Sequence, residues 1–251
     1  MRLTLLGTGS ASGMPVYGCD CEACDQARAK PELRRTACSA LLEVGEQRYL
    51  LDAGQLDLAE RFAAGTLSGI LLTHFHPDHV QGLFHLRWGS GLQIPVYCPT
   101  DSQGCADLYQ HPGILHFLPQ QKFNTFSIDN VEVTPLPLIH SKPTFGYLLE
   151  HAGQRLAYLT DTQGLPHRTL DYLVSHPPDL MVIDCTFPPT SEAQGHNNWH
   201  EMLKIHQQVR PTSTCLTHIG HAMQRWLTTH YTELPDTISV GRDGQQVFPL
   251  A

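Results

Sequence analysis

The sequence predicts a single domain of the mixed α/β (α+β) class, with antiparallel hairpins and strand–helix units in the same sheets. Short apolar runs typical of strands recur along the whole chain, and helix-like stretches separate many of them. Two pairs of neighbouring strands are joined by tight turns that contain glycine. Hairpins combined with interleaved helices favour mixed sheets over a purely parallel sheet. No repeat, low-complexity segment or linker divides the 251 residues, so we expect one domain over 1–251.

The expected elements are bounded by turn residues. Hairpins are expected between 39–44 and 48–52, around Gly45-Glu46, and between 144–150 and 155–160, around Gly153. The other expected strands are 3–7, 69–73, 94–98, 131–138, 180–185, 213–217 and 246–249. The expected helices are 22–30, 56–64, 79–86, 102–109, 167–176, 199–209 and 221–230.

Composition and charge narrow the classes of function. A hydrophobic content of 41% with 16% charged residues is typical of a folded globular protein. The net charge of -8 opposes a broad nucleic-acid surface, which needs a basic face. No stretch approaches the roughly 18 apolar residues of a membrane helix, and the first apolar run is too short for a signal peptide. We therefore expect a cytoplasmic protein, in which clustered cysteines bind metal more often than they form disulfides.

The segment 73–79, which reads THFHPDH, carries the strongest functional signal in the chain. It directly follows an apolar run, and in extended backbone His74 and His76 point the same way. Asp78 and His79 come where a helix can begin, so they can be aimed back at the same point. Imidazole and carboxylate ligands suit zinc, manganese or iron, and a cluster this dense can hold two ions. The alternative is a polar loop with chance histidines, since the chain contains 16 of them.

Three further residues repeat one layout, an apolar strand followed by a metal-ligand side chain. These residues are His140, Asp161 and His218. Each alone is a weak signal, because such residues often cap an element or lie in a solvated loop. Strands that end at one edge can bring their ligands together, and the resulting set suits two ions about 3.5–4 Å apart with one shared carboxylate.

This ligand set, in this order, resembles the metallo-β-lactamase superfamily from end to end of the chain, including the Leu-Leu-Asp-Ala-Gly stretch at 50–54. The resemblance implies a four-layer αββα sandwich with the site on the rim between the two sheets. It also implies that Asp52 is a buried residue that positions the motif loop, although a plain turn aspartate is the alternative. The implied ligands are His74, His76 and His140 for one ion, Asp78, His79 and His218 for the other, and Asp161 as the bridge.

A second metal site is expected in the loop near 18–25, where Cys19, Cys21 and Cys24 form a compact cluster. Tetrahedral zinc takes a fourth ligand, for which Cys38 and His221 are both candidates. Free thiols or a local disulfide are the alternative, because the first spacing is shorter than in the usual zinc knuckle. The other cysteines, Cys38, Cys98, Cys105, Cys185 and Cys215, are expected to be small buried hydrophobes.

The cysteine cluster, the segment 218–221 and the opening at 7–19 together resemble the PhnP family, the phosphodiesterases of the carbon–phosphorus lyase pathway. By this resemblance His221 completes a structural zinc site that pins the N-terminal loop to the C-terminal part of the fold. The resemblance also implies manganese at the active site, although the ligand set would accept zinc, iron or nickel. It implies a homodimer as well. The implied reaction opens 5-phosphoribosyl 1,2-cyclic phosphate to ribose 1,5-bisphosphate in phosphonate catabolism, by attack of a metal-bridging hydroxide; cyclic nucleotide 2′,3′-phosphates are possible side substrates.

The PhnP resemblance also places His196 beside the substrate, as a general acid or a hydrogen-bond donor to the phosphate, with Asp78 as a further catalytic residue. His200 is the local competitor, but it lies in an expected helix and is expected to be structural. The residues that bind the 5-phosphate are not fixed by the pattern. Lys142 and Arg225 are candidates, each with a solvated surface cation as the alternative.

Several rival functions share part of this pattern. A nuclease of the transfer-RNA 3′-processing type has the same metal ligands, but its long basic arm is not found and the charge of -8 opposes it. A protein of the pyrroloquinoline quinone pathway also carries a short cysteine cluster, whereas the full ligand set here favours hydrolysis. Thioester or β-lactam hydrolysis fits the motif alone. The same full ligand set opposes a non-enzymatic metal-binding module.

Overall fold

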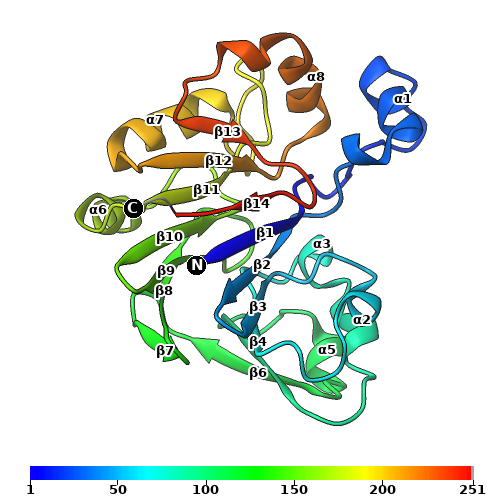
Figure 1. Ribbon diagram of the computed structural model, residues 1–251, viewed down its shortest axis with the longest axis vertical. Coiled ribbons are helices and arrows are strands. Elements are labelled where there is room, and N and C mark those ends of the chain that lie inside the picture. The colour runs from blue at the N-terminus through cyan, green and yellow to red at the C-terminus, as the bar shows by residue number, and fades with distance from the viewer. Residues whose placement is uncertain (250–251) are drawn as a thin grey trace.

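The computed structural model describes residues 1–249, which form two seven-stranded sheets (Figure 1). In order across the first sheet, the strands are β14 (Gln246–Val247), β1 (Arg2–Gly7), β2 (Ser39–Val44), β3 (Gln47–Leu51), β4 (Gly69–Leu71), β5 (Ile94–Pro99) and β6 (Leu115–Gln120). Across the second they are β13 (Ile238–Val240), β12 (Ser213–Thr217), β11 (Leu180–Asp184), β10 (Gln154–Leu159), β9 (Phe145–His151), β8 (Val131–Pro137) and β7 (Phe126–Ile128). The expected domain over 1–251 extends two residues beyond the described part.

Helices connect the strands and cover the sheets. They are α1 (Glu22–Ala29), α2 (Leu58–Arg61), α3 (Pro77–Val80), α4 (Leu83–Leu86), α5 (Ala106–Gln110), α6 (His167–Ser175), α7 (Trp199–Val209) and α8 (His221–His230), with the short 3-10 helices η1 (Pro31–Leu33) and η2 (Tyr231–Glu233). Within residues 1–249, none of these helices has the length and apolar character that a membrane span requires.

The two sheets pack face to face, and helices α2 to α8 lie on their outer faces. Leu5 and Tyr49 of the first sheet and Tyr147 and Tyr158 of the second are almost fully buried in the core between the sheets. Apolar side chains of α2 to α5 cover the first sheet, and those of α6 to α8 cover the second. The expected four-layer αββα sandwich is therefore confirmed (Figure 1).

Both sheets are mixed, as expected. The hairpin predictions are confirmed, because β2 pairs antiparallel with β3 and β9 pairs antiparallel with β10. Beyond the hairpins, β3 to β6 run parallel in the first sheet and β10 to β13 run parallel in the second. The carboxyl ends of the parallel strands in one sheet share an edge, which is where ligands gather in open α/β sheets.

Three expected helices are wrong in their extent: 56–64 is shortened to α2, 102–109 begins only where α5 begins, and the third is interrupted. The stretch 79–86 is divided into α3 and α4, and the break falls at Gly82. The Gly82 amide donates to the Ala53 carbonyl at 2.8 Å instead of continuing the helical ladder. A Cβ at position 82 would come within 2.1 Å of the Gln55 carbonyl oxygen, so only glycine allows this approach. The break ties α3 to the segment that follows β3.

Candidate metal centre

The expected metal ligands lie at strand ends along one rim between the sheets. His74 and His76 follow β4, and Pro77 opens the short helix α3 that carries Asp78 and His79. His140 lies in the loop after β8, Asp161 follows β10, and His218 directly follows β12. Since these strands belong to two different sheets, the site spans the rim at which the sheets meet.

The first group of ligand atoms belongs to His74, His76, His140 and Asp161, and these atoms lie within 4.8 Å of one another. The Nε2 atom of His74 is 2.9 Å from Nδ1 of His76, and Nε2 of His140 is 3.0 Å from the same Nδ1. Nitrogen ligands about 2.0–2.1 Å from one ion must lie roughly 3 Å apart. The three imidazoles therefore have the spacing that one metal ion requires.

The second group comprises Asp78, His79 and His218, with the same limit of 4.8 Å. Asp161 joins the two groups. Its Oδ2 atom lies 3.4 Å from Nε2 of His74 and 3.2 Å from Nε2 of His79, while its Oδ1 atom lies 3.3 Å from Nε2 of His218. One carboxylate thus contacts ligands of both groups, which is the arrangement of a bridging ligand.

Asp52 orients two of the imidazoles from beneath the site. Its buried carboxylate accepts a hydrogen bond from Nδ1 of His79 at 2.8 Å. It also accepts from the amide and hydroxyl of Thr73 at 2.7 and 2.9 Å, and the Thr73 hydroxyl can in turn accept from Nδ1 of His74 at 3.0 Å. When Nδ1 of a ring donates, its Nε2 carries the lone pair. Both rings therefore present Nε2 as the ligand atom.

The remaining three imidazoles are held in the same way. The partners are the Gly195 carbonyl for Nδ1 of His140 at 3.1 Å, the Thr186 hydroxyl for Nδ1 of His218 at 2.8 Å, and the Ser141 hydroxyl for Nε2 of His76 at 3.2 Å. Each ring thus keeps one nitrogen free to face the shared centre. Partners of this kind are typical of histidines that bind metal.

The electrostatics of the second ligand group favour positive charge, whereas burial lowers the pKa values of His74, His76 and His140 in the first group. Burial alone would lower the pKa of His218, but the Asp161 carboxylate and the contact with Asp78 raise this pKa to about 9. Burial would raise the pKa of Asp161, but His218 and His79 hold it well below its usual range. Within the described residues, Nε2 of His79 and Nε2 of His218 are buried and make no hydrogen bond of ordinary geometry. These nitrogens and the adjacent carboxylates fit divalent cations.

His196 lies above this centre and pairs with a carboxylate that the sequence analysis did not identify. The His196 ring stacks on the His218 ring with centroids 4.6 Å apart, and its side chain is 20% exposed. Its Nδ1 lies 2.7 Å from Oδ2 of Asp184, the fully buried last residue of β11. The same carboxylate accepts from the backbone amides of Thr162 and Thr186 at 3.1 and 3.0 Å. Asp184 therefore fixes the ring of His196.

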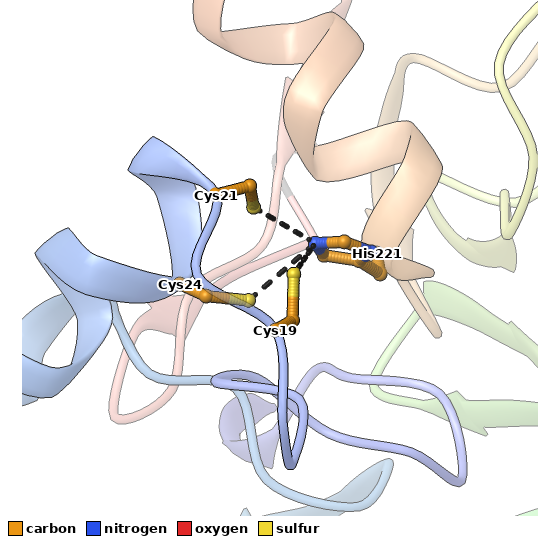
Figure 2. Close-up of side chains that lie close together, drawn as sticks. All are labelled: Cys19, Cys21, Cys24 and His221. Atoms are coloured by element: carbon orange, nitrogen blue, oxygen red, sulfur yellow. Dashed lines mark hydrogen bonds between the residues drawn. The ribbon is translucent and has the colours of Figure 1, made fainter.

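A separate cluster joins the N-terminal loop to the start of α8 (Figure 2). The Nε2 atom of His221 lies 3.6 Å from the sulfur of Cys19, 3.1 Å from that of Cys21 and 3.4 Å from that of Cys24. Hydrogen bonds from the Cys24 backbone amide and from His221 lower the pKa of the Cys21 thiol to about 6, which favours the thiolate that zinc binds. Three sulfurs and one imidazole nitrogen form the donor set of a closed tetrahedral zinc site.

Of the two candidates for the fourth ligand, the structure brings His221 to the cluster. Cys38 instead lies in the core between the sheets, with its sulfur 3.2 Å from the Thr217 hydroxyl. The expectation of small buried hydrophobes holds for Cys38, Cys98, Cys185 and Cys215, whereas Cys105 is half-buried.

The cysteine cluster is linked by hydrogen bonds to the end of β12, where His218 lies. The Ile219 amide donates to the Thr8 carbonyl at 2.8 Å, and the Ser10 amide donates to the Ile219 carbonyl at 3.2 Å. Ile219 lies between His218 of the metal centre and His221 of the cysteine cluster. The segment 8–10 therefore holds the loop that both histidines share.

We expect Cys21→Ser to remove the ion of the cysteine site and to lower the melting temperature. Loss of a structural metal is among the changes that cost about 3 kcal/mol or more. In a chain of this size that loss corresponds to roughly 6–12 °C. Elemental analysis and thermal unfolding measure the two effects. Cys105→Ser is the matched control, and a Cys21→Ser protein with wild-type metal content and melting temperature would contradict the structural-site assignment.

The other sequence candidates lie in different surroundings. His200 and Arg225 are exposed, on α7 and α8 respectively. Lys142 is half-buried two residues after His140, with its Nζ 3.4 Å from the Gly104 carbonyl and 3.6 Å from the Asp101 carboxylate. Of the two cations considered for substrate binding, Lys142 is thus the one on the ligand-bearing loop.

Known proteins resemble this chain over most of its length. The β-lactamase superfamily domain matches residues 47–219. An octanoyltransferase from Porphyromonas gingivalis is 27% identical over 99% of this chain and 51% of its own length. Ribonuclease Z from Mycobacterium sp. (strain KMS) is 30% identical over 70% of this chain and 65% of its own length. The chain therefore spans between about half and two thirds of these curated relatives.

A solved structure shows the same fold. The crystal structure of a diphosphatase from the PhnP family superposes with a TM-score of 0.83 at 24% sequence identity. The superposition covers 98% of this chain and 97% of that chain.

Proposed function

Because this chain belongs to the β-lactamase superfamily, we propose that it is a metal-dependent phosphodiesterase. The proposed reaction opens 5-phosphoribosyl 1,2-cyclic phosphate to ribose 1,5-bisphosphate. The proposal rests on one observation: Asp161 contacts both ligand groups, and the paired side chains of His196 and Asp184 lie above them. When bound, two divalent ions at such a centre supply a nucleophilic water at neutral pH and offset the charge of a phosphoryl group.

Residues of the chain would hold the two ions and supply the proton for the leaving group. His74, His76 and His140 would hold one ion, Asp78, His79 and His218 the other, and Asp161 both. In the reaction an oxygen–phosphorus bond forms from water while the bond from phosphorus to the ribose 2-oxygen breaks, and that oxygen takes up a proton. We assign this donation to Nε2 of His196, since Nδ1 of the same ring pairs with Asp184.

The remaining expectations belong to the same proposal. They are manganese at the active site, zinc in the Cys19, Cys21, Cys24 and His221 site, a homodimer, a cytoplasmic location and a place in phosphonate catabolism. They rest on the family resemblance of the motifs and on the thiolate-rich donor set of the second cluster, which suits zinc.

A second candidate is a nuclease that matures transfer RNA, favoured by the likeness to ribonuclease Z. The net charge of -8 opposes it, because an RNA-binding protein gains much of its affinity from basic side chains on phosphates. We therefore place this function second.

Turnover of the cyclic phosphate tests the proposal directly. Manganese-loaded protein is mixed with 5-phosphoribosyl 1,2-cyclic phosphate, the reaction is stopped with chelator, and the products are followed by phosphorus NMR. We expect the cyclic-phosphate resonance to be replaced by two monoester signals. Protein treated with chelator beforehand is the control. No turnover by protein that is shown to hold both active-site ions would remove the proposal, and precursor transfer RNA would be tried next.

A further inference from the structure

An open cavity of about 660 Å³ lies on the rim beside the candidate metal centre. One wall comes from the carboxyl ends of β5 and β6, and the other comes from the end of β8 and the loop that leads into β9. Because β4, β5 and β6 are parallel neighbours, their carboxyl ends share the edge from which His74 and His76 extend. The cavity and the metal centre are therefore on the same side of the sheet.

One loop contributes residues both to the metal centre and to the cavity. The loop between β8 and β9 carries His140 to the metal centre, and two residues later it places Lys142 in the cavity lining. Two residues of chain span at most about 7 Å between Cα atoms. The loop therefore holds the backbone of the two places close together, and the cavity volume lies within the range of about 300–1,000 Å³ that small-ligand sites occupy.

The cavity lining is suited to an anion. Lys122 and Lys142 contribute two ammonium groups, and Thr100, Gln120 and Thr144 contribute neutral hydrogen-bonding groups. The Lys142 side chain is only 25% exposed, so its charge is partly withdrawn from water. Ammonium groups in such a setting are common phosphate ligands.

The ammonium of Lys142 is oriented but weakly bonded. Its contacts with the Gly104 carbonyl and the Asp101 carboxylate are long, at 3.4 and 3.6 Å. Asp101 is itself held, since its Oδ1 accepts from the amides of Gln103 and Gly104, both at 2.9 Å. Its buried Oδ2 makes no hydrogen bond within residues 1–249. Asp101 therefore orients the Lys142 ammonium, and the ammonium keeps most of its hydrogen-bonding capacity for another acceptor.

We propose that this cavity binds a distal phosphate monoester of the substrate, with Lys142 and Lys122 as its cationic ligands, while the diester reacts at the metal centre. The inference rests on the proposed function, because it assigns the two ends of one substrate to two neighbouring places. It predicts a preference for small diesters that carry a second, terminal phosphate. Arg225, on α8, has no part in this site.

Kinetic discrimination tests the inference. Metal-loaded protein is given the cyclic diester with its 5-phosphate and the same ribose 1,2-cyclic phosphate without it, and the ratio of the two kcat/KM values is measured. We expect Lys142→Ala to lower this ratio by roughly 10- to 100-fold, as for the loss of a hydrogen bond to a charged group. Lys122→Ala should lower the ratio less, because Lys122 is more exposed. Lys142→Arg should lower the ratio less than Lys142→Ala does, because it keeps the positive charge. Lys204→Ala on α7 is the matched control for net charge and should leave it unchanged.

Binding separates failure of this inference from failure of the proposed function. Zinc-loaded protein is titrated with ribose 5-phosphate and, in parallel, with ribose, while backbone amide shifts are followed by NMR. Shifts around 120–122 and 142–144 with ribose 5-phosphate only, lost in Lys142→Ala, would support an anion site even if no cyclic diester is hydrolysed. Hydrolysis of the phosphorylated diester with an unchanged ratio in both lysine variants, and no such shifts, would overturn the cavity assignment and leave the proposed function standing.

Discussion

Asp161→Ala is expected to lower kcat/KM for the cyclic diester by about 1,000-fold or more, because a bound metal centre lowers the pKa of its water from 15.7 to about 7 and that gain is lost with the ions. Asp161 contacts ligands of both groups, through Oδ2 toward His74 and His79 and through Oδ1 toward His218. Its removal leaves those buried imidazoles without the negative charge that balances a cation. We therefore expect the variant to lose at least one of the two active-site ions.

The measurement is metal content by elemental analysis, paired with kinetics on the same preparations. Asp161→Asn keeps the side-chain volume but removes the charge, so it separates the effect of charge from that of packing. Asp171→Ala, on the exposed side of α6, is the matched control. Any ion of the cysteine site is counted separately, since the ligand group of that site does not include Asp161. An Asp161→Ala protein that keeps both active-site ions and the wild-type rate would contradict the dinuclear centre.

Local pattern predicted the mixed sheets and a candidate ligand set, whereas the four-layer arrangement of the sheets was implied by the family resemblance. Apolar runs locate the strands, and a polar residue at the end of such a run lies at a sheet edge whatever the details of packing. The strands that were missed, β6, β7 and β13, all lie at sheet edges. An edge strand pairs on one side only and is often short, so its apolar pattern is weak. The β6 segment also contains Pro119, which further obscures a strand pattern.

The local backbone conformation of the site could not be predicted from the sequence. Asp52, Asp161 and His218, each at the end of a strand, have φ values of 62°, 59° and 53°. This left-handed conformation is uncommon outside glycine, and it turns each side chain back toward the rim. No periodicity signals such a turn, because it is maintained by long-range contacts. One example is the hydrogen bond from the Asp52 amide to the Leu71 carbonyl at 3.0 Å.

Asp184 was missed although its signal was present. It ends the apolar strand β11, which is the layout that identified Asp161 and His218. The following residue, Cys185, is also apolar and buried, so the apolar pattern of the strand continues past the aspartate. Pairing with His196, twelve positions later in the chain, could be seen only once the loop that carries His196 was placed over the rim.

His196→Ala is expected to lower kcat more for substrates with a poor leaving group than for substrates with a good one. Hydrolysis of the ribose cyclic phosphate expels an alkoxide, and removal of its general acid should lower kcat by roughly 100- to 10,000-fold. Bis(p-nitrophenyl) phosphate expels a phenolate that is stable at neutral pH without a proton, so its kcat should fall less than about tenfold if proton donation is what is lost. Steady-state kinetics on both substrates measures the difference. Equal losses on the two substrates would exclude proton donation and leave His196 a phosphate ligand.

Asp184→Asn should reproduce part of this pattern, because Asp184 acts through His196. The buried carboxylate accepts from Nδ1 of His196, from the amides of Thr162 and Thr186 and from the Thr186 hydroxyl. An asparagine must direct its NH₂ group at some of these donors, which displaces the imidazole. We expect a loss of about 10- to 100-fold on the alkoxide substrate, as is typical for partners that orient a functional imidazole. If positioning is its role, the double variant should be no slower than His196→Ala alone. Additive losses would instead mean that Asp184 acts on the metal centre independently of His196.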